Sequence, residues 1–206
     1  MNPIPIDIAV EDELSESVAR RVLGHAAPKF AIGTTHRRGG FGYLRTRIRG
    51  WNEAARSRPI FLLTDLDDHA CPSALIEDWL GEDLHANLVF RVAVREIESW
   101  LLADWSGITT FLKIPKKYLR SCSPPVPEQL RDPKAALIDL CSRSSDRDVK
   151  LRIVPSAQST ARVGREYNTC LCEFAGQSWN PEEARRRASS LDRAIRRLAS
   201  FQPHWH

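Results

Sequence analysis

The 206-residue sequence lacks several features that would assign it to a well-defined class. No run approaches the roughly 18 apolar residues needed to span a bilayer as a helix, and the N-terminus, MNPIPIDIAV, lacks the basic region and long apolar stretch of a signal peptide. The five cysteines are odd in number and form no CxxC pair, so neither a disulfide framework nor a structural zinc site is expected. No Walker A motif is present, so the chain is not expected to hydrolyse nucleotides as P-loop proteins do. These absences favour a cytoplasmic protein with no membrane partner.

Basic residues outnumber acidic residues only slightly. The formal net charge is +4, from 30 basic and 26 acidic residues, and this excess alone does not indicate a nucleic-acid partner. The distribution is more informative, because arginines run through residues 37–58 and 185–197 while acids gather near predicted strand ends in the first half of the chain.

Predicted strands and helices alternate in the first half of the chain. Apolar runs predict strands at residues 4–10, 29–35, 60–64 and 87–94, and amphipathic stretches predict helices at 11–24, 43–57, 71–81 and 95–104. This alternation is typical of βαβ units and predicts a Rossmann-like α/β fold with a mostly parallel sheet. Only helices are predicted beyond about residue 106, at 132–142, 164–174 and 181–201. We therefore expect a catalytic α/β domain at 1–105 and a helical extension at 106–206 packed on it.

Acidic residues follow three of the predicted strands. They are Glu11, Asp12 and Glu13 after the first strand, Asp65, Asp67 and Asp68 after the third, and Glu96 and Glu98 after the fourth. Binding sites of parallel sheets form outside the carboxyl ends of the strands, where these carboxylates would repel one another. A bound Mg²⁺ or Mn²⁺ would remove that conflict, because hard cations prefer oxygen ligands. Any one acid alone is better read as a helix cap, but three groups at three strand ends favour a metal site.

Three segments resemble a Toprim domain, and more narrowly the Toprim-like relatives of the OLD-family nucleases. They are VEDELSE (10–16), LTDLDD (63–68) and VREIESWLLAD (94–104), with weaker similarity in REYNTCLCEF (165–174). The Toprim pattern has a glutamate after the first strand, matched by Glu11, and a DxD after the third, matched by Asp65 and Asp67. Glu16 resembles the end of a VEGxTE motif, although Asp12 replaces the glycine and one residue is inserted. Glu98 resembles an active-site acid of the family's ExWLLAD segment.

The resemblance implies a Mg²⁺- or Mn²⁺-dependent nuclease, with Glu11, Asp65, Asp67 and Glu98 as catalytic residues and Glu16 as a further metal ligand. Phosphodiester cleavage needs neutralised phosphate charge, an activated water and a stabilised leaving oxygen, which carboxylate-held metal ions provide. The implied partners are nucleic acid and an ABC-type ATPase encoded nearby, as in bacterial anti-phage defence pairs. The sequence leaves open whether the chain forms a homo-oligomer.

Three other functions use similar acids. A response-regulator receiver would need a hydroxyl residue after the fourth strand and a lysine after a fifth, whereas Arg95 and Glu96 follow the fourth strand here and no fifth is predicted. A haloacid-dehalogenase phosphatase carries its DxD after the first strand, not the third. A Toprim shell that binds or regulates without turnover stays open as the alternative.

Basic residues supply candidate phosphate contacts. The stretch THRRGGFGYLR (35–45) places Arg37 and Arg38 in a glycine-rich segment that would cradle a phosphate or else form a solvated loop. Lys134, in RDPKAAL at a helix start, is either a phosphate ligand or a surface lysine. In the last predicted helix, Ala184, Ala188, Leu191, Ile195 and Leu198 form an apolar seam, and its arginines form either a solvated face or a nucleic-acid surface.

Overall fold

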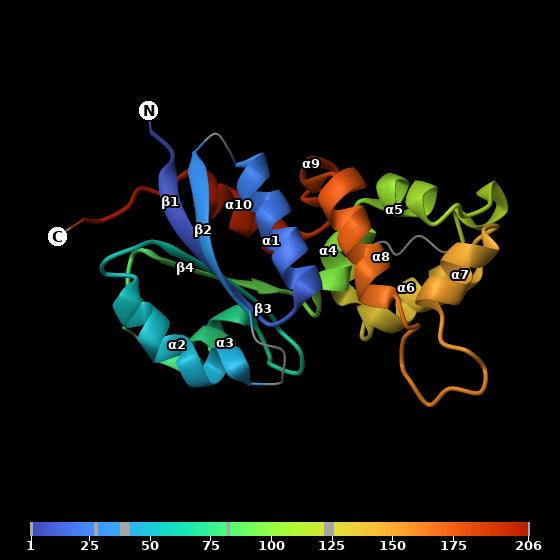
Figure 1. Ribbon diagram of the computed structural model, residues 1–206, viewed down its shortest axis with the longest axis horizontal. Coiled ribbons are helices and arrows are strands. Elements are labelled where there is room, and N and C mark those ends of the chain that lie inside the picture. The colour runs from blue at the N-terminus through green and yellow to red at the C-terminus, as the bar shows by residue number, and fades with distance from the viewer. Residues whose placement is uncertain (1, 27–28, 38–41, 82, 122–125, 206) are drawn as a thin grey trace.

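A four-stranded parallel sheet forms the centre of the protein. The computed structural model describes residues 2–26, 29–37, 42–81, 83–121 and 126–205 (Figure 1). The strands, in the spatial order β2-β1-β3-β4, are β1 (Ile4–Val10), β2 (Phe30–Arg37), β3 (Ile60–Asp65) and β4 (Leu88–Ala93). Every pairing in this sheet is parallel, which confirms the predicted α/β fold class.

Helices separate the strands and make up most of the rest of the chain. The helices that alternate with strands are α1 (Glu13–His25), α2 (Tyr43–Ala54), α3 (Pro72–Leu80) and α4 (Ile97–Ala103). The later elements are α5 (Trp105–Phe111), η1 (Lys116–Tyr118), η2 (Pro127–Gln129), α6 (Pro133–Ser142), α7 (Arg147–Ile153), α8 (Tyr167–Glu173), the π turn η3 (Phe174–Ser178), α9 (Pro181–Ala184) and α10 (Ser189–Ala199). Across these described helices, none is long and apolar enough to cross a bilayer.

Both faces of the sheet are covered, so the central strand β3 is an apolar run over residues 60–63. Side chains alternate along β3: Phe61 and Leu63 join the core on the α1 side, while Ile60 and Leu62 join the core beneath α2 and α3. A strand buried on both faces needs apolar residues at every position, which is why residues 60–64 show no polar alternation.

The C-terminal helices share a core with the sheet. Helix α10 packs on β4, and α8 and η3 pack on α1. Leu171, Trp179 and Leu191 are fully buried in the same cluster as Ile6 and Ile8 of β1. In Figure 1 the chain leaves the sheet through α5 to α7 and returns to it at α10. The division of the chain at residue 105 stays a prediction.

The single helix predicted for residues 181–201 is wrong, because the structure has two helices there. Helix α9 ends at Ala184, and α10 starts after Ala188, which has an extended backbone. Both oxygens of the Glu128 carboxylate bind the start of α10: they accept the backbone N–H groups of Ser189 and Ser190, each at 2.8 Å, and both serine hydroxyls. A carboxylate at a helix N-terminus satisfies exposed amides and complements the helix dipole. A residue about 60 positions away therefore fixes where α10 begins.

The apolar seam of residues 184–198 is buried as predicted, although two helices share it. Ile195 retains only 4% of its accessible surface, and Leu191 and Leu198 retain none. We expect Ile195→Asp to lower the free energy of unfolding by roughly 3 kcal/mol or more, because it buries an unpaired charge. Ile195→Val, the matched control, should cost about 1 kcal/mol. Urea denaturation measures both, and an aspartate variant as stable as the valine variant would show that α10 is not docked on the sheet.

Candidate metal-binding and catalytic site

The acidic residues predicted from the sequence lie along one edge of the sheet. Because all four strands are parallel, their carboxyl ends share this edge. Glu11 follows the last residue of β1, Asp65 is the last residue of β3, and Glu98 lies in the first turn of α4, just beyond β4. The structure thus brings together Glu11, Asp65, Asp67 and Glu98, and it adds Lys134 from the start of α6.

The turn after β3 is fixed by backbone contacts with the turn after β4. The N–H of Leu66 donates to the carbonyl of Ala93 at 2.9 Å, and the N–H of Asp67 donates to the carbonyl of Arg95 at 3.0 Å. Arg95 Nη1 returns a hydrogen bond of 3.1 Å to the carbonyl of Asp67. Asp67 has a φ of 49°, in the left-handed region that few residues other than glycine adopt. Aspartate adopts this region more readily than most non-glycine residues, because its short polar side chain can hydrogen-bond locally.

Asp65 lies at the electrostatic centre of the acidic edge. Burial raises the pKa of its carboxyl group well above the usual range, and four other carboxylates raise it further, those of Glu98, Asp67, Asp12 and Glu11. Burial also raises the pKa of Asp67, and the charge of Asp68 adds to this effect. The crowding inferred from the strand ends is therefore present in the folded protein.

Glu11 is partly buried and hydrogen-bonded. Its Oε1 accepts a hydrogen bond of 2.8 Å from the hydroxyl of Thr64, the residue before Asp65. Burial raises the pKa of Glu11, the Thr64 hydrogen bond opposes this, and Asp67 and Asp12 raise it further. The neighbouring Asp12 caps α1 by accepting the N–H of Ser15 at 2.8 Å, so helix capping accounts for that acid.

Glu98 is the most buried acid of the site, with 2% of its surface exposed. Its Oε1 accepts a hydrogen bond of 2.8 Å from the Tyr167 hydroxyl and lies 3.5 Å from Lys134 Nζ. Its Oε2 is buried and has no hydrogen-bond partner among the described residues. Burial raises the pKa of Glu98, while Lys134 lowers it. An unpaired buried carboxylate oxygen is costly, which makes it a candidate ligand atom.

Lys134 is held in place by the acids that follow β4. Its backbone N–H donates to Glu96 Oε2 at 3.0 Å, and its Nζ lies 3.8 Å from Glu96 Oε1. Burial lowers the pKa of Lys134, but the charges of Glu98, Glu96 and Asp65 raise it by more, so the net effect is an increase. The side chain is therefore a cation at neutral pH. Lys134 is part of the acidic site, not a solvated surface lysine.

Glu16 and Arg37 lie beside the acidic edge but are paired with other residues. Glu16 forms ion pairs with Arg20 at 2.8 Å and with Arg37 at 3.1 Å, and Arg37 also pairs with Glu13 at 2.7 Å. Arg37, predicted in a glycine-rich loop, instead ends β2 next to Val10 of β1. Arg38 lies outside the described residues. Over the described ranges, no three His, Cys, Asp or Glu side chains are placed so that they could hold a metal ion.

Sequence reasoning missed Tyr167 and Thr64. Tyr167 lies 69 positions from its partner Glu98, and its only signal was its place in the segment REYNTCLCEF. Thr64 ends the apolar run before Asp65, where its hydroxyl is the one polar side-chain group in residues 60–64.

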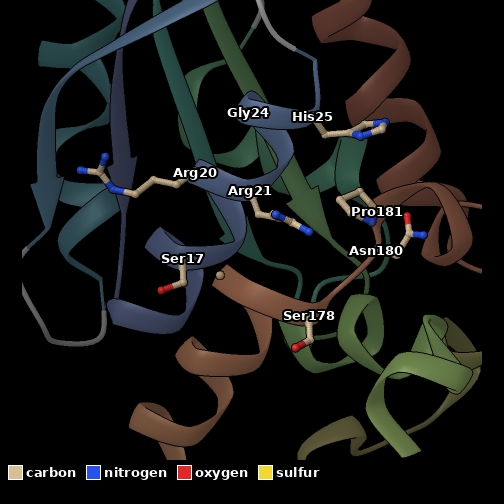
Figure 2. Close-up of a pocket in the computed structure, with 9 residues that line it drawn as sticks. Ser17, Arg20, Arg21, Gly24, His25, Ser178, Asn180 and Pro181 are labelled. Carbon is tan, nitrogen blue, oxygen red and sulfur yellow. The ribbon is translucent and has the colours of Figure 1, made fainter. Parts of the chain in front are cut away.

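Two cavities lie near the site without enclosing it. One of about 460 Å³ is lined by Thr35, His36, Arg37, Tyr43, Arg47 and Trp51. A larger one of about 760 Å³ lies between α1 and the segment 176–181 (Figure 2), where Arg21 Nε donates to the carbonyl of Trp179 at 3.1 Å and His25 Nε2 lies 2.7 Å from Glu182 Oε1. None of the predicted site residues lines this larger cavity. The acids of the candidate site line neither of these two cavities.

Comparisons with known proteins identify no relative of this chain. No family model matches the chain, and neither a search of curated proteins nor a search of solved structures finds a significant match.

The crowded carboxylates around Asp65 should lower the free energy of unfolding of the metal-free protein as the pH rises. The folded protein holds the Asp65 proton more tightly than the unfolded chain, so this group favours folding below about pH 4, and that contribution is lost as pH rises through the raised pKa. Asp65→Asn should therefore raise the free energy of unfolding in EDTA at pH 8, by about 1.4 kcal/mol for each unit of pKa elevation, and the gain should shrink towards pH 4.

Asp83→Asn, at an exposed position outside the acidic edge, is the control and should change stability little at either pH. The measurement is urea denaturation across this pH range. If Asp65→Asn raised the free energy of unfolding by the same amount at pH 4 and at pH 8, this would contradict the repulsion between carboxylates at Asp65.

Proposed function

We propose that the protein is a Mg²⁺- or Mn²⁺-dependent nuclease that hydrolyses phosphodiester bonds of DNA or RNA. The observation that carries this proposal is that carboxylates from three strand ends act on Asp65, whose pKa is raised first by burial and then by their charges. A fold does not gain stability from such crowding, so a function for it is the simpler explanation.

The donor groups fit a hard divalent cation. Asp65, Asp67 and Glu11 offer only carboxylate oxygens, and Glu98 Oε2 is a buried oxygen without a partner among the described residues. Binding would require Glu11 to turn from Thr64, because the described side chains do not already surround one point. When bound, such a cation supplies charge neutralisation at the phosphate and lowers the pKa of a bound water.

The remaining residues have roles that follow from their contacts. Glu11, with its raised pKa and partial exposure, is suited to accept a proton from the attacking water. Lys134, a cation held beside Glu98, is placed to bind a non-bridging phosphate oxygen. Tyr167 donates to Glu98 and thereby fixes the orientation of that carboxylate.

Glu16 is left out of the proposed ligand set, because it would first have to release Arg20 and Arg37. Arg37 likewise has two acidic partners and contributes little free positive charge. The resemblance to Toprim-like nucleases extends the proposal to a partner ABC-type ATPase and a role in bacterial defence.

The proposal predicts that Glu11→Gln abolishes cleavage. Loss of the proton acceptor should slow cutting of plasmid DNA or of a labelled RNA in Mn²⁺ by at least about a hundredfold. Glu13→Gln is the matched control: Glu13 is exposed, pairs with Arg37 and lies outside the proposed set, so this variant should cut at close to the wild-type rate. EDTA should stop the wild-type reaction. A fully active Glu11→Gln would remove Glu11 from the mechanism, and wild-type protein that binds Mn²⁺ but cuts neither substrate would favour the non-catalytic regulatory alternative.

A further inference from the structure

Arg91 is a half-buried arginine on the edge strand β4. Val89 and Ala93, two positions to either side, belong to the core on the α1 and α10 face of the sheet, so the side chain of Arg91 points to the same face. Its Nε atom is inaccessible to solvent and has no hydrogen-bond partner in the described part of the chain. Charged side chains are almost never buried without a partner.

Helix α10, which packs over β4, carries two further arginines that have no acidic partner among the described residues. Arg193 and Arg197 are four positions apart on α10 and so lie on one side of the helix. Arg193 Nη1 is 3.4 Å from the hydroxyl of Ser189, and Arg197 donates to the carbonyl of Ala86 at 3.2 Å and lies over the ring of Phe201. These partners are all neutral. We call Arg91, Arg193 and Arg197 the arginine cluster.

Other arginines of the same region have acidic partners. Arg185 and Arg196 each lie 2.7 Å from Asp192, and Arg186 lies 3.0 Å from Glu183. The arginines of this region therefore fall into two groups: Arg185, Arg186 and Arg196 pair with acids, while Arg193 and Arg197 form no ion pair with any described carboxylate.

The positive charges of Arg193 and Arg197 act on Arg91. Burial lowers the pKa of Arg91 to about 10, and the charges of Arg197 and Arg193 contribute to the shift. Burial also lowers the pKa of Lys29, again with a contribution from Arg197. Positive charge is thus concentrated between β4 and the exposed side of α10 without a counter-ion from the described residues, and an external anion would relieve the repulsion.

We propose that the arginine cluster binds a backbone phosphate of the nucleic-acid substrate and so guides the strand along the β4 edge towards the acidic site. The identity of this ligand rests on the proposed nuclease function. Arg91 lies on β4, and Arg193 and Arg197 lie on α10, which packs over this strand. Donors from two elements suit a compact anion with several oxygens better than a flat acidic protein surface.

The position of the cluster supports a path to the acidic edge. The first turn of α10 contacts the carboxyl end of β4, where the N–H of Val94 lies 3.3 Å from the Ser190 hydroxyl, and its last turn reaches the amino end, where Arg197 donates to the carbonyl of Ala86. The helix therefore runs along the whole strand, with Arg193 between these two ends.

Two residues beyond Val94, Glu96 begins the acidic segment that contains Glu98. A phosphate held by the cluster would therefore lie beside the strand whose carboxyl end enters the site. The arginines themselves would supply the positive charge that the acids need nearby if the site is to accept a polyanion.

The test compares two double variants that each remove two positive charges. Arg193→Gln with Arg197→Gln removes the unpaired arginines, and Arg186→Gln with Arg196→Gln removes paired ones and is the matched control. Affinity for short fluorescein-labelled DNA and RNA strands is measured by anisotropy over a range of KCl concentrations, in EDTA so that catalysis plays no part. We expect the first variant to lose at least about tenfold in affinity at low salt and to flatten the salt slope by about one to two units. The control should keep a slope close to that of the wild type.

A second measurement separates loss of binding from loss of folding. In KCl without phosphate, the Arg193→Gln, Arg197→Gln protein should melt at or above the wild-type temperature, because the repulsion on Arg91 is relieved. At equal ionic strength, inorganic pyrophosphate should raise the melting temperature of the wild type more than that of this variant.

The outcomes distinguish this inference from the nuclease proposal. Equal salt slopes for the two double variants would overturn the inference. It would also be overturned if stabilisation by pyrophosphate depended on the arginine cluster but oligonucleotide binding did not, because the ligand would then be a small phosphate compound. Binding that depends on the cluster in a protein that cuts nothing would uphold the inference and overturn the nuclease.

Discussion

Repulsion among carboxylates at one edge of a parallel sheet is the constraint on which the rest of this structure depends. Four strands running in the same direction bring Glu11, Asp65 and the acids after β4 to a common edge. Hydrogen bonds from Thr64 and Tyr167, and the charge of Lys134, offset part of the repulsion. They leave Asp65 with a strongly raised pKa and one oxygen of Glu98 without a described partner. A divalent cation is the simplest group that would complete this arrangement.

The C-terminal half of the chain builds the outer layer of the site. Helix α8 contributes Tyr167, and α6 contributes Lys134, which Glu96 anchors through its backbone N–H. Helix α10 starts where Glu128 caps it and lies against β4, so the same capping contact sets the position of the arginine cluster. Acids at the strand ends and positive charge along β4 are therefore parts of one arrangement. The first would act on a phosphodiester, and the second would hold the strand that contains it.

The sequence predicted what depends on local pattern and strand direction. Apolar runs located the four strands, and the rule that parallel strands end at one edge accounts for the position of Glu11, Asp65 and Glu98 at the carboxyl ends of three of them. The sequence pattern could not predict contacts between distant positions. These include the hydrogen bond of Tyr167 to Glu98 and the Glu128 cap that separates α9 from α10. The arginines of residues 185–197 could be sorted only in part. Arg196 pairs with Asp192 at the spacing of one helical turn, but Arg185 reaches Asp192 across the break between α9 and α10, which a single predicted helix does not allow for.

Calorimetric titration of Mn²⁺ into the wild-type protein and into an Asp65→Asn, Asp67→Asn double variant tests the central claim most directly. Asparagine keeps the size of both side chains and tolerates the left-handed backbone at position 67, so the fold should survive, and circular dichroism checks that it does. If the crowded carboxylates exist to hold metal, the wild type binds Mn²⁺ with measurable heat and the folded double variant does not. Equal affinity in the two proteins would show that the acidic edge is not a metal site.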